Sequence, residues 1–206
     1  MIFLFSETKN YDINKLMRAF IAIELPQEIK NTLSRLQAKL KAAGADVKWV
    51  EPNNIHLTLK FLGEIDEQIN GKVNSCLEKI RETQKPFTIS LSSPGAFPNT
   101  SSPRVVWVGI KQGDAEIKGL TIFLEKQAAE IGLPTENREF SSHITIGRVR
   151  SGKNRRELAE LLSKLSQNSL EDNPFPANKI TLFKSTLTSR GPVYEVLKEF
   201  PLSYKH

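Results

Sequence analysis

The sequence is poor in cysteine. Cys76 is its only cysteine among 206 residues, so an intrachain disulfide is excluded. With one cysteine and three histidines, the chain cannot supply a Cys/His zinc site of the usual ligand spacing. Because disulfides accumulate in oxidising compartments and are rare in reducing ones, the composition favours a cytoplasmic protein.

Long apolar runs are also missing. No stretch approaches the roughly 18 residues that a bilayer-spanning helix needs. The opening residues, MIFLF, are too short for the apolar region of a signal peptide, have no basic segment before them and no small-residue cleavage site after them. We therefore expect no membrane association.

Several common catalytic signatures are absent: the sequence contains no GxGxxG, GxxxxGK, GxSxG or HExxH pattern. The carboxylates nearest to the motifs described below, Glu51, Glu64 and Glu139, are not spaced as a set of metal ligands. These absences predict chemistry that needs no metal and no other cofactor.

The remaining composition is that of a soluble globular protein, with 39% hydrophobic and 25% charged residues. The length suits one large domain or two small lobes. The net charge of +6 favours an anionic partner, such as nucleic acid or a phosphorylated substrate.

One four-residue pattern occurs twice, as His56-Leu57-Thr58-Leu59 and as His143-Ile144-Thr145-Ile146. The third histidine, His206, is the last residue. Alternation with period two predicts that both stretches are strands, with the aliphatic residues toward a core and His and Thr on the opposite face. Residues i and i+2 on one strand face lie roughly 6.6 to 6.8 Å apart, so each His/Thr pair can contact a single group of phosphate size.

Two histidines suit acid-base chemistry at a phosphodiester. Neutral and protonated imidazole coexist near neutral pH, so one ring can accept a proton while the other donates one. In-line displacement places the attacking and leaving oxygens on opposite sides of phosphorus, which fits a base on one wall of a cleft and an acid on the other. The threonine hydroxyls and a nearby cation would then hold the non-bridging oxygens.

Two basic residues are candidates for that cation. By strand parity, Lys60 shares the face of His56 and Thr58, whereas Arg148 shares the parity of the core residues. Arg148 can face the site only if the strand bends, and Gly147 is a plausible position for a bulge. The alternative is that Arg148 is simply solvated at a strand end.

The pattern of elements predicts an α+β fold with mainly antiparallel sheets, because several strands follow one another through loops too short for a crossover. We expect one motif strand in each of two lobes, facing across a cleft. A loop carrying Phe97 and Arg104 is either a binding loop or an ordinary connection. Residues 1–16 show no clear period and are expected to be an N-terminal extension. Strands are expected at 18–25, 47–50, 55–64, 87–91, 105–110, 140–149, 177–188 and 193–200, and helices at 27–43, 69–82, 115–131 and 154–165.

At this level of detail the sequence resembles the 2H phosphoesterase superfamily, which carries two HxTx motifs half a chain apart. The stretches MRAFIAIELP (17–26), WVEPNNIHLTLKFLGE (49–64), PRVVWVGI (103–110), SSHITIGRVR (141–150) and LFKSTLTSRGPVYEVL (182–197) resemble its RNA 2',3'-cyclic phosphodiesterase branch, also called 2'-5' RNA ligase. The likeness runs from Met17 to about Leu202 and excludes the first 16 residues.

The resemblance implies one bilobal, pseudo-symmetric domain over residues 17–206 that hydrolyses a terminal RNA 2',3'-cyclic phosphate to a 2'-phosphate without metal. It also implies RNA ends, cyclic or 2'-5' linked, as partners, and reversible ligation at the same centre. We expect a monomer. His56 would be the acid and His143 the base, with Thr58, Thr145 and Arg148 as phosphate ligands.

Two alternatives stay open: a non-catalytic module that binds RNA ends, and a phosphodiesterase for a small cyclic nucleotide or 2'-5' oligoadenylate. Three aromatic residues, Phe97, Phe183 and Tyr194, are either base-stacking groups or parts of the core.

Overall fold

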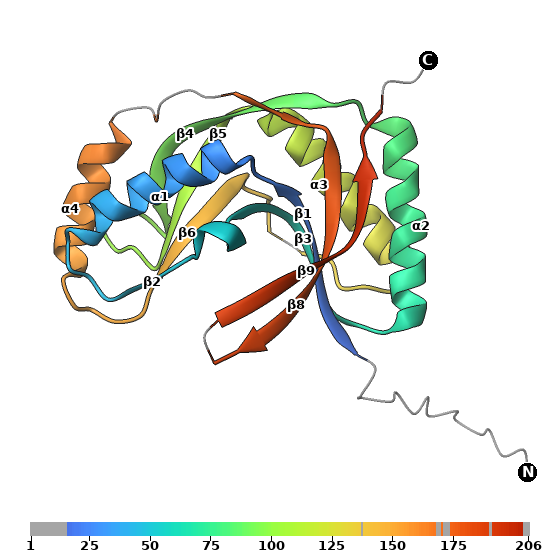
Figure 1. Cartoon of the computed structure of the whole chain (residues 1–206), viewed down its shortest axis with the longest axis horizontal. Helices are drawn as coiled ribbons and strands as arrows, with labels where there is room; N and C mark the ends of the chain where they lie inside the picture. The colour runs from blue at the N-terminus through green and yellow to red at the C-terminus, as the bar shows by residue number, and fades with distance from the viewer. Residues whose placement is uncertain (1–15, 137, 168–169, 171–173, 190, 204–206) are drawn as a thin grey trace, which may run out of the picture.

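The computed structural model describes residues 16–136, 138–167, 170, 174–189 and 191–203 (Figure 1). The helices in these ranges are α1 (Gln27–Lys41), α2 (Glu67–Thr83), α3 (Asp114–Glu130) and α4 (Arg155–Ser166), and a 3₁₀ turn, η2, covers Pro52–Asn54. The strands are β1 (Met17–Glu24), β2 (Val47–Trp49), β3 (His56–Ile65), β4 (Phe87–Phe97), β5 (Val105–Gln112), β6 (His143–Val149), β7 (Phe175–Ala177), β8 (Lys179–Thr188) and β9 (Gly191–Pro201).

Local sequence explains where the first elements begin. Helix α1 starts directly after Pro26, whose fixed φ suits a helix entrance, and it carries acidic Glu28 in its first turn. Helix α2 starts at a conventional cap, because the Asp66 carboxylate accepts a hydrogen bond from the backbone N–H of Ile69 at 2.7 Å. This cap moves the start of the helix to Glu67, two residues before the predicted one.

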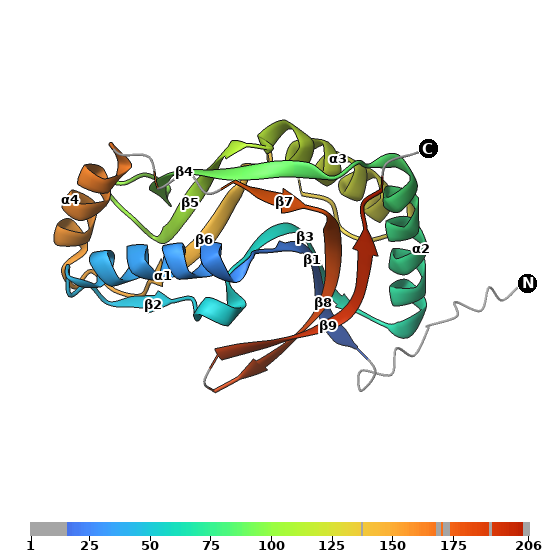
Figure 2. The same ribbon diagram turned by 45° about the horizontal axis from the view of Figure 1, so that its top comes forward.

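The strands form two sheets in which every ladder is antiparallel, as predicted. One sheet has the order β3-β1-β8-β9 and the other has the order β2-β6-β5-β4-β7. With helices packed on both sheets, this is the α+β architecture that the sequence predicts. Figure 2 shows the β8–β9 hairpin leaving the four-stranded sheet and projecting from the body of the molecule.

The two halves of the chain exchange strands between the sheets. Strands β3 and β1 of the first half are joined by β8 from the second half, and β6 and β5 of the second half are joined by β4, which follows α2. The trios β3-β1-β8 and β6-β5-β4 therefore occupy equivalent places. The helices are exchanged in the same way: α1 of the first half packs on β6 of the second half, and α3 of the second half packs on β3 of the first half.

A single hydrophobic cluster connects the two sheets. It includes Ile21 and Leu57 from the four-stranded sheet and Val108 and Ile144 from the five-stranded sheet, all at most 2% exposed. The two motif strands consequently share one packed core. None of the helices in the described part of the chain is long and apolar enough to cross a membrane.

Three predictions about the elements need correction. Strand β4 extends to Phe97, so Phe97 lies in a strand and not in a loop, and its pairing with β5 is irregular at Leu91 and Pro94. Residues 173–176, including Pro174 and Pro176, are expected from the sequence to form a loop before the strand at 177–188, but β7 begins at Phe175 and pairs with β4. The second motif strand begins at His143, not at residue 140. The expected extension over residues 1–16 lies outside the described residues apart from Leu16, and β1 begins at Met17.

Candidate active site

The structure brings the two motifs together. Strand β3 carries His56 and Thr58, strand β6 carries His143 and Thr145, and the two strands contact each other although they belong to different sheets. In each copy the aliphatic residues are buried and the His and Thr side chains are half-buried. The predicted division into a core face and a polar face is therefore confirmed for both motifs.

Each histidine is held in the same way by the backbone two residues before it. The Nδ1 atom of His56 lies 2.7 Å from the carbonyl oxygen of Asn54, and Nδ1 of His143 lies 2.7 Å from that of Ser141. A carbonyl can only accept, so Nδ1 donates in both rings. In the neutral rings Nε2 is consequently the atom without a proton, which leaves it ready to accept one.

Burial favours the neutral form of both rings. It lowers the pKa of His56 to about 4, against the opposing effect of the Asn54 carbonyl and with a further contribution from the charge of Lys30. Burial also lowers the pKa of His143, where the Ser141 carbonyl opposes it and the charge of Arg148 adds to it.

Aromatic rings surround His56. Phe20 stacks on its imidazole with ring centroids 4.8 Å apart, and Tyr194 meets it edge-on at 5.3 Å. Phe183 stacks on Phe20 at 5.1 Å, and its ring centroid lies 6.3 Å from that of His56. Of the three aromatic candidates, Phe183 and Tyr194 thus lie beside His56.

Aromatic rings also contact His143. Phe97 meets its ring edge-on at 5.0 Å, and Trp107 lies 6.4 Å away. Sequence reasoning missed Phe20 and Trp107. The signal for Phe20 was present, because it alternates with Ala22 on the polar face of β1, where a large aromatic residue is unexpected.

Both motif strands contain a one-residue bulge at the last residue of the motif. Ala22 pairs with Thr58 and Ile21 with Lys60, so Leu59 has no partner, and the corresponding irregularity on β6 falls at Ile146. A bulge reverses the alternation of side chains beyond it.

The prediction that Lys60 shares the face of His56 is wrong because of this bulge. Lys60 is 3% exposed, and its ammonium donates to a Glu125 carboxylate oxygen at 2.7 Å and to the carbonyl of Pro134 at 3.1 Å. Phe61 takes its place on the outer face and is 56% exposed.

The equivalent bulge on β6 places Arg148 on the face of His143. Gly147 turns inward, where an added Cβ would come within 2.9 Å of the Trp49 ring, and Arg148 is exposed. The positive charge of Arg148 lowers the pKa of His143. It also lowers the pKa of Tyr194, on the other sheet, although burial raises that pKa overall. The predicted bulge is thus present, one residue before Gly147, at Ile146. Within the described residues, no three His, Cys, Asp or Glu side chains gather as potential metal ligands.

Comparison with known proteins points in one direction. The profile of the family described as LigT-like phosphoesterase matches residues 23–107 and, a second time, residues 108–194, so that each match contains one motif. The chain is 36% identical to the RNA 2',3'-cyclic phosphodiesterase of Methanothermobacter thermautotrophicus, over 90% of this chain and 99% of that protein. It is 37% identical to the protein of the same name from Aquifex aeolicus, over 91% and 98%.

Solved structures agree with these relatives. The crystal structure of TT0787 from Thermus thermophilus is similar with a TM-score of 0.78 and 28% identity, covering 92% of this chain and 100% of that one. The crystal structure of LigT from E. coli in complex with 3'-AMP is similar with a TM-score of 0.75 and 28% identity, covering 92% and 99%.

Proposed function

Because this chain belongs to the LigT-like phosphoesterase family, we propose that it is an RNA 2',3'-cyclic phosphodiesterase that converts a terminal 2',3'-cyclic phosphate into a 2'-phosphate. The observation that carries the proposal is the matched pair of histidines on contacting strands, each held at Nδ1 by a backbone carbonyl. A module that only binds RNA ends would not need two proton-transfer groups in the same orientation.

In the proposed reaction, His143 accepts a proton from water at Nε2 while the water oxygen attacks phosphorus. The bond from phosphorus to O3' breaks, and His56 donates a proton to the departing oxygen, which leaves the phosphate on O2'. Because burial favours neutral His56 in the free protein, the negative charge of the bound phosphodiester is what stabilises its protonated form. Solvent exchange then restores both rings.

The proposed phosphate ligands are Thr58, Thr145 and Arg148. The hydroxyls lie two residues from each histidine on the same strand face, and the bulge brings Arg148 to that face. Together they would stabilise the charge that develops on the non-bridging oxygens. At the equivalent position of β3 stands Phe61, so at this position only the second motif strand supplies a cation.

The direct test is turnover of an oligoribonucleotide ending in a 2',3'-cyclic phosphate, in EDTA, with 2'- and 3'-phosphate products resolved. The expected product is the 2'-phosphate. Binding of this RNA without turnover would contradict the proposal and favour a binding module. Turnover of small cyclic nucleotides or 2'-5' oligoadenylate in preference to RNA would instead identify one of these as the substrate.

The lowered histidine pKa values predict an acidic optimum for the free enzyme. One histidine must be neutral and the other protonated, so kcat/KM is limited by two pKa values that both lie below 6.5. We expect kcat/KM to peak below pH 6.5 and to fall as the pH rises further, and kcat, which reports the anion-bound state, to peak at a higher pH. A plateau in kcat/KM that extends above pH 8 would contradict the assignment.

Replacing Thr58 or Thr145 with valine should lower kcat/KM by about tenfold to 100-fold each, the effect of losing one hydrogen bond to a charged group, about 1.5 to 3 kcal/mol. Valine keeps the branched shape that suits a strand. The matched controls are Thr58→Ser and Thr145→Ser, which keep the hydroxyl and should retain most of the activity. Equal kcat/KM values for the valine and serine variants would show that the threonine hydroxyls do not bind the phosphate.

We further propose that residues 17–206 act as one monomeric domain in the cytoplasm. The continuous core between the sheets and the exchanged strands support a single folding unit. Light scattering coupled to gel filtration tests the oligomeric state, with the mass of one chain, 23.2 kDa, as the expected value.

A further inference from the structure

A strongly basic segment leads away from the candidate active site. It begins at Arg148, whose charge acts on His143 from the other end of β6, and runs through Arg150 and Lys153 to Arg155 and Arg156 at the start of α4. Five of nine consecutive residues are therefore cationic, in a chain whose net charge is +6. Four of the five are exposed, and Arg155 is half-buried. Such a concentration of positive charge attracts an extended anion.

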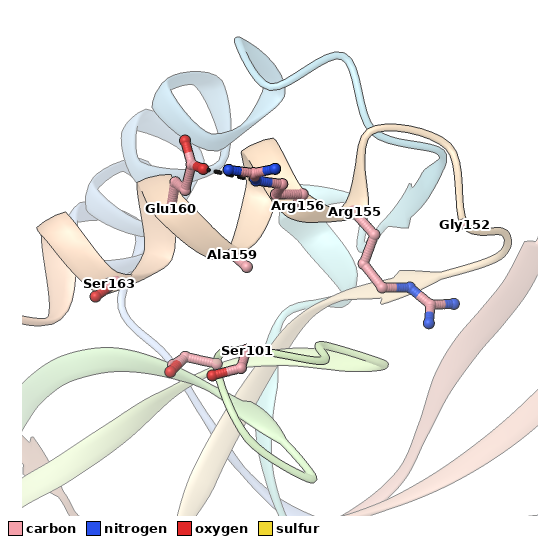
Figure 3. Close-up of a pocket in the computed structure, with 8 residues that line it drawn as sticks. Ser101, Gly152, Arg155, Arg156, Ala159, Glu160 and Ser163 are labelled. Carbon is pink, nitrogen blue, oxygen red and sulfur yellow. Dashed lines mark hydrogen bonds and ion pairs between the residues drawn. The ribbon is translucent and has the colours of Figure 1, made fainter.

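This segment ends at an open groove of about 570 Å³ between α4 and the loop that joins β4 to β5. Arg155, Arg156 and Glu160 line it from α4, and Thr100 and Ser101 line it from the loop. Figure 3 shows Ser101 facing the helix across the groove, with the two guanidinium groups pointing to different sides. Glu160 accepts from Arg156 at 3.2 Å, so the groove keeps an excess of positive charge.

Two features of the groove leave donors without partners. The Nε atom of Arg155 is buried and, within the part of the chain that the structure describes, has no hydrogen-bond partner. Asn154, at the N-cap of α4, accepts no capping hydrogen bond, and its side-chain nitrogen donates instead to the carbonyls of Ala43 and Gly44. The positive end of the helix is thus left open, which favours an anion.

The groove lies within reach of the reacting end. Gly152, at its edge, is four residues after Arg148, which limits their separation to about 14 Å. On the other side, Thr100 is three residues from Phe97, which contacts His143. A stacked strand advances about 3.4 Å per nucleotide, so about four nucleotides or fewer span this interval.

We propose that the groove between α4 and the β4–β5 loop is a phosphate subsite that holds the RNA backbone a few nucleotides upstream of the terminal cyclic phosphate. This inference rests on the proposed function, because it places the reacting end at the two histidines. Arg155 and Arg156 bind non-bridging phosphate oxygens, and the hydroxyls of Thr100 and Ser101 donate from the opposite wall. The subsite reads charge and not sequence.

The test compares a short and a long substrate in the variant Arg155→Ala/Arg156→Ala. For an oligoribonucleotide of about eight residues with a terminal cyclic phosphate, we expect kcat/KM to fall about tenfold, since two phosphate contacts are lost. The slope of log kcat/KM against log salt concentration should become shallower by about 1.4, because each lost phosphate contact on a single strand contributes about 0.7. For a nucleoside 2',3'-cyclic monophosphate, we expect no change.

The matched control is Lys72→Ala/Arg81→Ala, which removes the same charge from exposed positions of α2, at the opposite end of the molecule (Figure 1). Equal losses in this control, equal losses for both substrate lengths, or no loss at all would each overturn the subsite. Failure of the wild type to hydrolyse either substrate would reject the proposed function instead. Fluorescence anisotropy with a 3'-phosphorylated RNA of about eight residues then still tests the subsite, which predicts about tenfold weaker binding by the α4 variant.

Discussion

Replacing either His56 or His143 with alanine is expected to lower kcat for the cyclic phosphate by about 10² to 10⁴-fold, the range for loss of a general acid or base. Both rings present Nε2 in the same way, held by the carbonyls of Asn54 and Ser141, so neither has a substitute for its proton transfer. The loss should appear in kcat, because the transferred proton matters in the transition state more than in the bound ground state.

Three measurements make this result decisive. The double variant His56→Ala/His143→Ala should be little worse than either single variant, since the two rings act as a unit. The control His206→Ala changes the third histidine, outside both motifs, and should keep full activity. If one of the single motif variants retained more than about a tenth of the wild-type kcat, the two-histidine mechanism would be wrong.

The second large effect concerns stability, at the buried ion pair between Lys60 and Glu125. The Lys60 side chain is 1% exposed, whereas that of Glu125 is 28% exposed. Glu125→Leu should lower the free energy of unfolding by about 3 to 5 kcal/mol, because among the described residues it leaves the buried ammonium with the Pro134 carbonyl as its one remaining acceptor. Lys60→Met should cost about 1 kcal/mol, because the remaining carboxylate can be hydrated.

Urea unfolding at pH 7 measures both variants. Glu195→Ala, which removes an exposed partner of Lys184, serves as the control and should change stability by less than about 1 kcal/mol. Equal effects for Glu125→Leu and Lys60→Met would show that the asymmetry in burial does not govern the cost of breaking the pair.

Local pattern was sufficient to predict most of the fold. Alternation identified β1 and the two motif strands, and the start of α1 followed from Pro26 and Glu28. The same alternation correctly placed the side chains of His56 and His143 on the strand face opposite the core. These features depend on residues that are neighbours in the sequence, which is why one sequence contains enough information to predict them.

The features that sequence reasoning missed depend on partners far along the chain. The unpaired position at Leu59 arises from the pairing of β3 with β1, and it moves Lys60 into the core. The short β7 exists because it pairs with the first residues of β4, Phe87 to Ile89, about 88 positions earlier in the chain. Alternation alone contains no information about a partner strand, so it assigned Lys60 to the wrong face.

The bulges also explain why a repeated motif produces an unsymmetrical site. Five residues after its histidine, the first copy presents the exposed ring of Phe61, and the second copy presents the guanidinium of Arg148. The equivalent backbones therefore place an apolar surface on one side and a positive charge on the other. A substrate with a base at one end and phosphate at the other can distinguish the two sides.

The exchange of strands between the halves has a consequence for synthesis of the chain. Strand β1 lies between β3 and β8, and Ala19 pairs with Lys184, which follows it by 165 positions. At about 5 to 20 residues per second, a ribosome needs roughly ten to thirty seconds to add them. During that time one edge of β1 has no strand to pair with, so the four-stranded sheet can be completed only after β8 and β9 have been translated.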